Sequence, residues 1–211
     1  MLLYYITDRK GFAGTESDQR SSLLHRIADA ARAGVDYIQL REKDLPREEL
    51  EPLAREVVRA VRENSAVTKL LINSHSDVAI AGGADGVHLP AGFPPADEVR
   101  DYWVRNGNRE PIIGVSAHSV EDVRQAESNG ASFAVLAPIF EKGATGAKGL
   151  GLKVLRQACS PSSKQQSDFT VFALGGVTLA NARSCIDAGA GGIAGIRLFQ
   201  QGDVAETVSR L

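Results

Sequence analysis

Two glycine-containing turns near the C-terminus are the residues of this sequence best suited to hold a phosphate. Gly175, Gly176 and Val177 follow one apolar, strand-like run, and Gly195 and Ile196 end the next one. Glycine lets an anion approach the backbone closely enough for N–H groups to donate hydrogen bonds to it. These residues therefore predict a phosphate site. The alternative is that the glycines only close two turns.

A serine and a histidine follow an earlier apolar run, at Ser116 and His118. An imidazole has a reference pKa near neutrality, so His118 is the best candidate for general acid–base catalysis. The alternative is that His118 or Ser119 caps a helix expected to begin at Val120. Ser116 lacks the Gly-x-Ser-x-Gly surroundings of a hydrolase nucleophile, which argues against acyl transfer.

Polar side chains also follow two strand-like runs in the first half of the chain. Strand alternation would place Gln39, Arg41 and Lys43 on one side, where an amide and two cations could hold a diphosphate or a carboxylate. The alternative is a solvated charged turn. Asn73 could bond the edge of a heterocycle, or cap a helix that begins near Ser76.

The remaining histidines and lysines near strand ends allow several interpretations. His88 lies between apolar neighbours and is interpreted as a core histidine, while His75 and Asp77 have no third partner that would make a metal site. The glycine-rich segment that contains Lys142 and Lys148 predicts a lid over an anionic substrate. The alternative for this segment is a disordered connection.

Short apolar runs alternate with amphipathic segments along the whole chain, which is typical of repeated βα units. Eight runs predict strands, at residues 3–7, 37–40, 70–73, 86–89, 112–116, 133–137, 171–174 and 192–196. Apolar positions at three- and four-residue steps predict helices between them, for example at residues 22–33, 47–62, 120–129 and 179–188.

One turn sequence recurs between a helix and the next strand, and it carries Gly34, Gly83, Gly130 or Gly189. Glycine adopts the left-handed conformation that ends a helix at little cost. This repeat favours a single (β/α)8 TIM-barrel domain over residues 1–211. An open doubly wound sheet is the alternative, although no Gly-x-Gly-x-x-Gly follows the first run.

Composition limits the partners of the chain. With 211 residues, 43% of them hydrophobic, and a net charge of −2, the sequence predicts one domain with no general attraction for nucleic acid or anionic lipid. No apolar run approaches the roughly 20 residues that span a bilayer, and the N-terminus lacks signal-peptide features. Cys159 and Cys185 do not suggest a disulfide framework. We expect a cytoplasmic protein with a small substrate.

Six segments together make the chain similar to the thiamine phosphate synthase/TenI family over almost its full length. They are Tyr5-Ile6-Thr7-Asp8-Arg9, Gln39-Leu40-Arg41-Glu42-Lys43-Asp44, Gly83-Ala84-Asp85-Gly86-Val87-His88-Leu89, Gly114-Val115-Ser116-Ala117-His118-Ser119, Ala137-Pro138-Ile139-Phe140 and Gly175-Gly176-Val177. The resemblance implies a TIM barrel of thiamin biosynthesis. It further implies that a thiazole phosphate is bound around Gly176 and after the eighth strand. A pyrimidine diphosphate would lie at Gln39, Arg41, Lys43 and Asn73.

The chain departs from the synthases of this resemblance where they carry acidic residues that hold Mg²⁺. Those positions read Asn73-Ser74 and Pro90-Ala91-Gly92-Phe93 here, which removes the carboxylate ligands that a hard cation needs. The segment Leu89-Pro90-Ala91-Gly92 resembles the Leu-Pro-Ser-Gly of TenI-type thiazole tautomerases. We therefore expect a tautomerase that uses neither metal nor cofactor.

In that reaction the resemblance assigns general acid–base catalysis to His118 and phosphate binding to Gly176, Val177, Gly195 and Ile196. Lys142 or Lys148, with Arg41, would hold the substrate carboxylate. Arg197 replaces a serine usual in the synthases, and it would either strengthen phosphate binding or block a larger substrate. Two other functions stay open, a Mg²⁺-dependent thiamine phosphate synthase and a non-catalytic regulatory binder. A homodimer is a further possibility.

Overall fold

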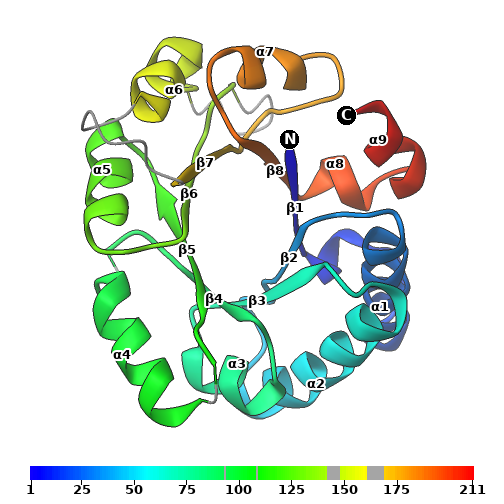
Figure 1. The fold of residues 1–211 in the computed structure, drawn as a ribbon. Helices are drawn as coiled ribbons and strands as arrows, with labels where there is room; N and C mark the ends of the chain where they lie inside the picture. Colours follow the sequence, from blue (N-terminus) through cyan, green and yellow to red (C-terminus); the bar gives the residue numbers. More distant parts are fainter. Residues whose placement is uncertain (93, 108, 142–147, 161–168) are drawn as a thin grey trace.

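Eight parallel strands form a closed barrel in the computed structural model, which describes residues 1–92, 94–107, 109–141, 148–160 and 169–211. Each strand pairs with its neighbour in sequence, and β8 pairs back with β1, so the sheet has no free edge (Figure 1). The strands are β1 (Leu2–Ile6), β2 (Tyr37–Leu40), β3 (Lys69–Asn73), β4 (Gly86–Leu89), β5 (Ile112–Ala117), β6 (Phe133–Leu136), β7 (Thr170–Ala173) and β8 (Gly192–Gly195). The predicted (β/α)8 barrel is thereby confirmed.

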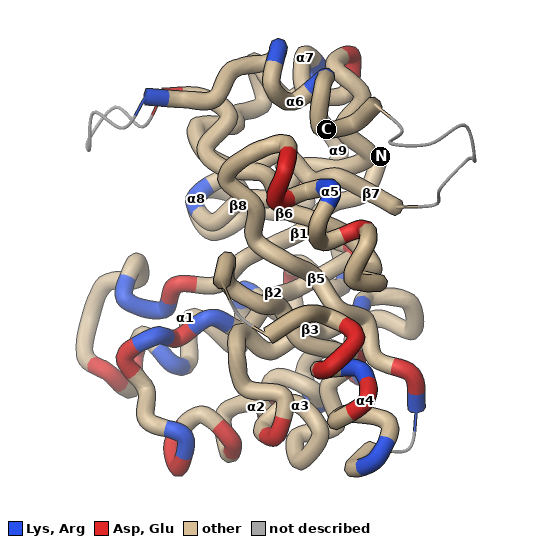
Figure 2. The backbone as a smooth tube through the Cα atoms, turned by 90° about the vertical axis from the view of Figure 1, so that its left-hand side faces the viewer, with Lys and Arg blue, Asp and Glu red and all other residues tan. Residues whose placement is uncertain are grey.

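Helices surround the barrel on the outside (Figure 1). They are η1 (Arg9–Gly11), α1 (Glu16–Arg32), α2 (Arg47–Asn64), α3 (Ser76–Gly82), α4 (Ala96–Asn106), α5 (Val120–Ser128), α6 (Gly151–Cys159), α7 (Ala182–Asp187), α8 (Arg197–Gln200) and α9 (Val204–Arg210). Figure 2 shows that basic and acidic residues are interspersed along these helices. Among the described residues, no helix is long and apolar enough to cross a membrane.

The repeated turn adopts the conformation that its glycines predict. Gly34, Gly83, Gly130 and Gly189 have φ values of 92°, 78°, 76° and 102°. These are left-handed angles, which glycine reaches without the steric cost that a Cβ would add. The turn thus ends a helix and leads into the next strand at four places around the barrel.

Aromatic rings fill the barrel interior below its mouth. Tyr4, Phe133 and Phe172 are buried, and their ring centroids lie 5.0–5.6 Å apart with edge-to-face geometry. Strand glycines make room for them, because a Cβ at Gly114 would lie 2.5 Å from the Phe133 ring and one at Gly192 would lie 2.4 Å from Phe172. The rings close the interior and leave the carboxyl ends of the strands open to ligand.

Element boundaries differ from the sequence prediction where side chains cap the backbone. Helix α1 begins at Glu16, six residues before the predicted start, because Thr15 and Asp18 form a capping box. Helix α7 begins at Ala182 instead of residue 179, because residues 178–181 form a turn in which the Thr178 N–H donates to the Asn181 side-chain oxygen. Local side-chain bonds of this kind do not show in hydrophobic periodicity.

Candidate active site at the carboxyl ends of the strands

A cavity of about 1060 Å³ opens at the carboxyl ends of the strands. Eleven of the predicted site residues line it, namely Gln39, Arg41, Asn73, Ser116, His118, Gly175, Gly176, Val177, Gly195, Ile196 and Arg197. Side chains from β2, β3 and β5 therefore meet the two glycine turns that follow β7 and β8. This is the end of a TIM barrel at which ligands bind.

Two of the predicted lysines, Lys43 and Lys148, do not join this group. Strand β2 ends at Leu40, so strand alternation does not extend to Lys43, which is exposed and does not line the cavity. The chain instead turns Glu42 inward, where it accepts hydrogen bonds from the Thr7 hydroxyl at 2.6 Å and the Arg9 N–H at 3.0 Å. Lys148 is likewise exposed and does not line the cavity, and Lys142 lies outside the described residues.

The glycines of the first turn are required by its shape. Gly175 and Gly176 have φ values of 93° and 68°. A Cβ on Gly175 would lie 2.7 Å from Pro138, and one on Gly176 would lie 2.7 Å from the Cβ of Phe140. Both the backbone conformation and the close packing exclude a side chain here, so the turn presents backbone to the cavity.

Asn181 holds that turn in place. Its side-chain oxygen accepts from the Thr178 N–H at 2.8 Å, and its amide nitrogen donates to the Gly176 carbonyl at 3.0 Å. Within the described residues, the N–H groups of Gly176 and Val177 have no acceptor, and the same is true of Ile196 after β8. As far as the structure is described, these three backbone donors are thus available to an anion in the cavity.

His118 is fixed in one orientation and one tautomer. Its Nδ1 lies 2.9 Å from the Ala137 carbonyl, which can only accept, so Nδ1 carries the proton. Its backbone N–H donates to the Asp122 carboxylate at 2.7 Å, a bond that lowers the pKa of Asp122. Nε2 has no partner among the described residues and, in the neutral ring, holds a lone pair that can accept a proton. The ring is exposed and lines the cavity.

A second histidine joins a buried chain of hydrogen bonds on the cavity wall. The Gln39 amide donates to the Tyr4 hydroxyl at 2.8 Å, and that hydroxyl lies 3.1 Å from His88 Nδ1. His88 Nε2 lies 2.9 Å from the Ser116 hydroxyl. Burial, and secondarily the charge of Arg41, lower the pKa of His88 to about 3, so the ring is neutral near pH 7.

These contacts set the direction in which protons are donated along this series of hydrogen bonds. Because Tyr4 accepts from Gln39, its own proton goes to His88 Nδ1, and the ring proton then sits on Nε2 and is donated to Ser116. The Ser116 hydroxyl proton is consequently left for a ligand acceptor. His88 is the core residue that its apolar neighbours indicate, and it also lines the cavity.

The charged groups that line the cavity are mostly basic. Arg41 and Arg197 make no ion pair or side-chain hydrogen bond with the described part of the chain, whereas Arg210 contacts Glu206 at 3.1 Å. Asp8 is the single carboxylate among the described lining residues. This balance favours an anionic ligand.

Magnesium does not fit the rim after β3 and β4. The Asn73 amide donates to the Ser74 hydroxyl at 2.8 Å. The described residues directly after Leu89 that line a pocket there are Pro90, Ala91 and Gly92, and none of them has a side-chain oxygen. In the described part of the chain, no group of three or more His, Cys, Asp and Glu side chains could hold a metal. Mg²⁺ is usually bound through one or two carboxylates together with substrate phosphates, and none of the described residues directly after β3 or β4 that line either pocket is a carboxylate.

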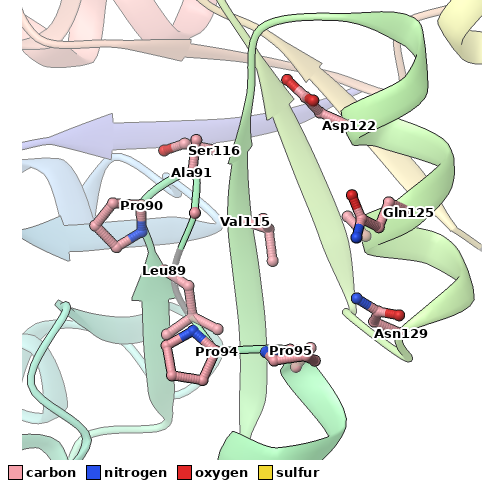
Figure 3. A pocket seen from close by; sticks show the side chains of 13 residues that line it. Leu89, Pro90, Ala91, Pro94, Pro95, Val115, Ser116, Asp122, Gln125 and Asn129 are labelled. Carbon is pink, nitrogen blue, oxygen red and sulfur yellow. The ribbon is translucent and has the colours of Figure 1, made fainter.

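A smaller pocket of about 140 Å³ shares Ser116 with the large cavity. Figure 3 shows Asp122 and Gln125 on α5, and Asn129 directly after it, across from Pro94 and Pro95. Pockets for small organic ligands measure roughly 300–1,000 Å³. We therefore assign the substrate to the large cavity.

Several residues of the site were not among those predicted from the sequence. Asp8 could have been found, since it directly follows the first strand-like run. Tyr4 and His88 meet only because the barrel closes, and Asn181 acts through local backbone bonds. Arg210 belongs to the last helix and reaches the cavity from outside the barrel.

Comparison with known proteins shows which family this chain is similar to. The family described as thiamine monophosphate synthase matches residues 3–199. A putative thiamine-phosphate synthase 2 from Aquifex aeolicus is 40% identical over 93% of this chain and 96% of its own. A thiamine-phosphate synthase from Halalkalibacterium halodurans is 35% identical over 89% of this chain and 82% of its own.

A solved structure agrees with these relatives. Thiamine phosphate pyrophosphorylase from Pyrococcus furiosus superimposes with a TM-score of 0.79 at 29% identity, over 100% of this chain and 93% of that one. The family match and the barrel with its rim of glycine turns lead to one assignment. The chain belongs to the thiamine phosphate synthase/TenI family of thiamin biosynthesis.

Proposed function

We propose that the chain is a thiazole tautomerase, which binds a carboxythiazole phosphate and moves a proton from C2 of its ring to the exocyclic carbon without a metal or cofactor. One observation carries the proposal. In the described part of the chain, His118 presents an Nε2 without a partner to the same cavity as the backbone donors of the glycine turns, and the rim after β3 and β4 gathers no carboxylates. A positioned base suffices for proton transfer, but departure of a diphosphate calls for charge neutralisation.

The proposed reaction balances as an isomerisation. His118 Nε2 takes the proton from C2 of the thiazole ring and becomes an imidazolium. The C–H electron pair shifts into the ring, the exocyclic double bond becomes the nucleophile, and the exocyclic carbon takes a proton back from His118. The product is an aromatic thiazole, and the histidine returns to its neutral form.

The other lining residues bind and orient the substrate in this proposal. The phosphate accepts hydrogen bonds from the N–H groups of Gly176, Val177 and Ile196, and Arg197 adds a charged contact. Arg41 faces the carboxylate, while the Ser116 hydroxyl donates to an acceptor on the ring. Such contacts contribute about 1–3 kcal/mol each, so several of them are needed for micromolar binding.

The names of the relatives favour a second candidate, the thiamine phosphate synthase reaction. Both proteins cited above from Aquifex and Halalkalibacterium carry that name, the first of them as putative. The pyrimidine diphosphate would then lie near Gln39, Arg41 and Asn73, which line the cavity on the side of β2 and β3. Because the rim does not fit Mg²⁺, we derive no step through the metal. A binder without catalysis, and a homodimer, stay predictions.

Two assays on the purified chain separate these functions. One follows conversion of the carboxythiazole phosphate tautomer without added metal, and the other follows thiamin phosphate formation with Mg²⁺. We expect activity in the first only. His118→Asn should lower the tautomerase rate at least about 100-fold while the substrate still binds.

A matched control is His25→Asn, on the exposed face of α1, which should leave the rate unchanged. Mg²⁺-dependent formation of thiamin phosphate would establish the synthase instead. Binding of thiazole phosphate without turnover in either assay would support the non-catalytic binder.

A further inference from the structure

The large cavity continues past the glycine turns to the outside of the barrel. Beyond β8 it is lined by residues of α8 and α9 together with the turn that precedes α7. In Figure 1, α8 and α9 lie side by side next to β8. We call this part the outer lobe and define it by the lining residues Leu179, Arg197, Leu198, Gln201, Thr207 and Arg210.

Two arginines dominate the charge of the outer lobe. Arg197, at the start of α8, has no ion pair or side-chain hydrogen bond with the described residues. Arg210 contacts Glu206 at 3.1 Å, but both side chains are more than half exposed, so the pair contributes little and its partner is easily exchanged. None of the residues that define the outer lobe is acidic.

The lobe is separate from the groups assigned to the thiazole ring. Ser116 lies at the end of β5 and His118 directly follows it, and Arg41 follows β2, whereas Arg197 and Arg210 belong to the helices after β8. Consider a ligand whose phosphate lies on the glycine turns. Its thiazole ring would extend from that phosphate toward β2 and β5, and the outer lobe of the protein would lie on the opposite side of the phosphate. Guanidinium groups match phosphoryl oxygens in both geometry and charge.

We propose that the outer lobe binds a second phosphoryl group, so that the cavity accepts diphosphates at the β8 side of the barrel. The proposal rests on the proposed function only for the first phosphate, which occupies the glycine turns. Arg210 contacts the second phosphoryl group, and Arg197 stands between the two.

The test compares inorganic phosphate with inorganic pyrophosphate by calorimetric titration of the full chain at fixed ionic strength. Pyrophosphate should bind about tenfold tighter or more, because charged hydrogen bonds to a second phosphoryl group add binding energy. Arg210→Gln should remove most of this advantage and leave phosphate affinity within about twofold, and Arg210→Lys should restore part of it.

Arg183→Gln is the matched control, since Arg183 forms a similarly exposed pair with a carboxylate one helical turn away, at 2.9 Å from Asp187. Equal binding of phosphate and pyrophosphate would overturn the proposal. So would a pyrophosphate advantage that survives Arg210→Gln but is lost in Arg41→Gln, because that result puts the second phosphoryl group on the β2 side. These titrations involve no turnover, so their outcome is independent of the tautomerase assay.

Discussion

Two arginines at the ends of neighbouring strands have opposite surroundings. Arg9, after β1, is 3% exposed and contacts Glu16, Glu42 and Asp44 at 2.7, 3.4 and 2.7 Å. Arg41, after β2, lines the cavity and has no ion pair within the described residues. The number of carboxylates around each guanidinium, and not the residue type, separates a structural cation from one that is available to a ligand.

The largest expected effect is on the structural arginine. Arg9→Ala should lower the free energy of unfolding by about 3–5 kcal/mol, because it leaves Glu42 buried without its charged partner. Urea denaturation followed by circular dichroism measures this change. Arg20→Ala breaks a half-exposed pair with Glu56 and should cost about 0–1 kcal/mol. Equal losses in the two variants would contradict the distinction.

The cavity arginine should behave in the opposite way. Arg41→Gln should leave the free energy of unfolding within about 0.5 kcal/mol, because the Arg41 side chain has no hydrogen-bond or ion-pair partner among the residues that the structure describes. Substrate binding should weaken by about 1.5–3 kcal/mol, since a charged hydrogen bond to the ligand is removed. Titration with the carboxythiazole phosphate measures this loss. An unstable variant with unchanged affinity would place Arg41 in the structural class.

The smallest expected effect is a pH dependence of the free energy of unfolding, which arises because His88 is buried. Below pH 6.5 the unfolded chain binds a proton at this residue, whereas the folded chain does so only near pH 3. This contribution to stability is fully present above pH 6.5 and is lost as the pH falls toward 3. The slope should reach about 1.4 kcal/mol per pH unit for the single proton.

Urea denaturation at pH 5.5 and 7.5 measures that dependence. His88→Gln should reduce the difference between the two pH values, because the amide does not titrate. The same difference in the wild type and the variant would show that His88 is not the residue responsible.

The fold could be predicted from the sequence because its signals are local. Apolar runs, amphipathic segments and the repeated glycine turn each report on a few neighbouring residues, and the eight predicted strands lie within one residue of the observed ends. Residues at strand ends, such as Gln39, Asn73 and His118, were predictable for the same reason. The position of Lys43 was predicted wrongly, because strand alternation stops at Leu40, where β2 ends.

The rest of the site depends on contacts between distant elements. The hydrogen bonds of Tyr4 with Gln39 and His88 join residues 35 and 84 positions apart, and they exist only in the closed barrel. Arg210 reaches the cavity because α9 packs beside α8, which no periodicity reveals.

Ser74 is the one described residue other than glycine with a positive φ, at 67°. Aspartate and asparagine tolerate this left-handed conformation better than other residues with a side chain. The backbone at Ser74 thus already has a conformation that aspartate adopts, and serine and aspartate could be exchanged here in evolution without a change in the loop. An acidic residue is harder to introduce after β4, because it would have to replace Pro90 or Ala91 and change the turn whose backbone the proline restricts. A change between the proposed tautomerase and a synthase would accordingly be easier to start at β3 than at β4.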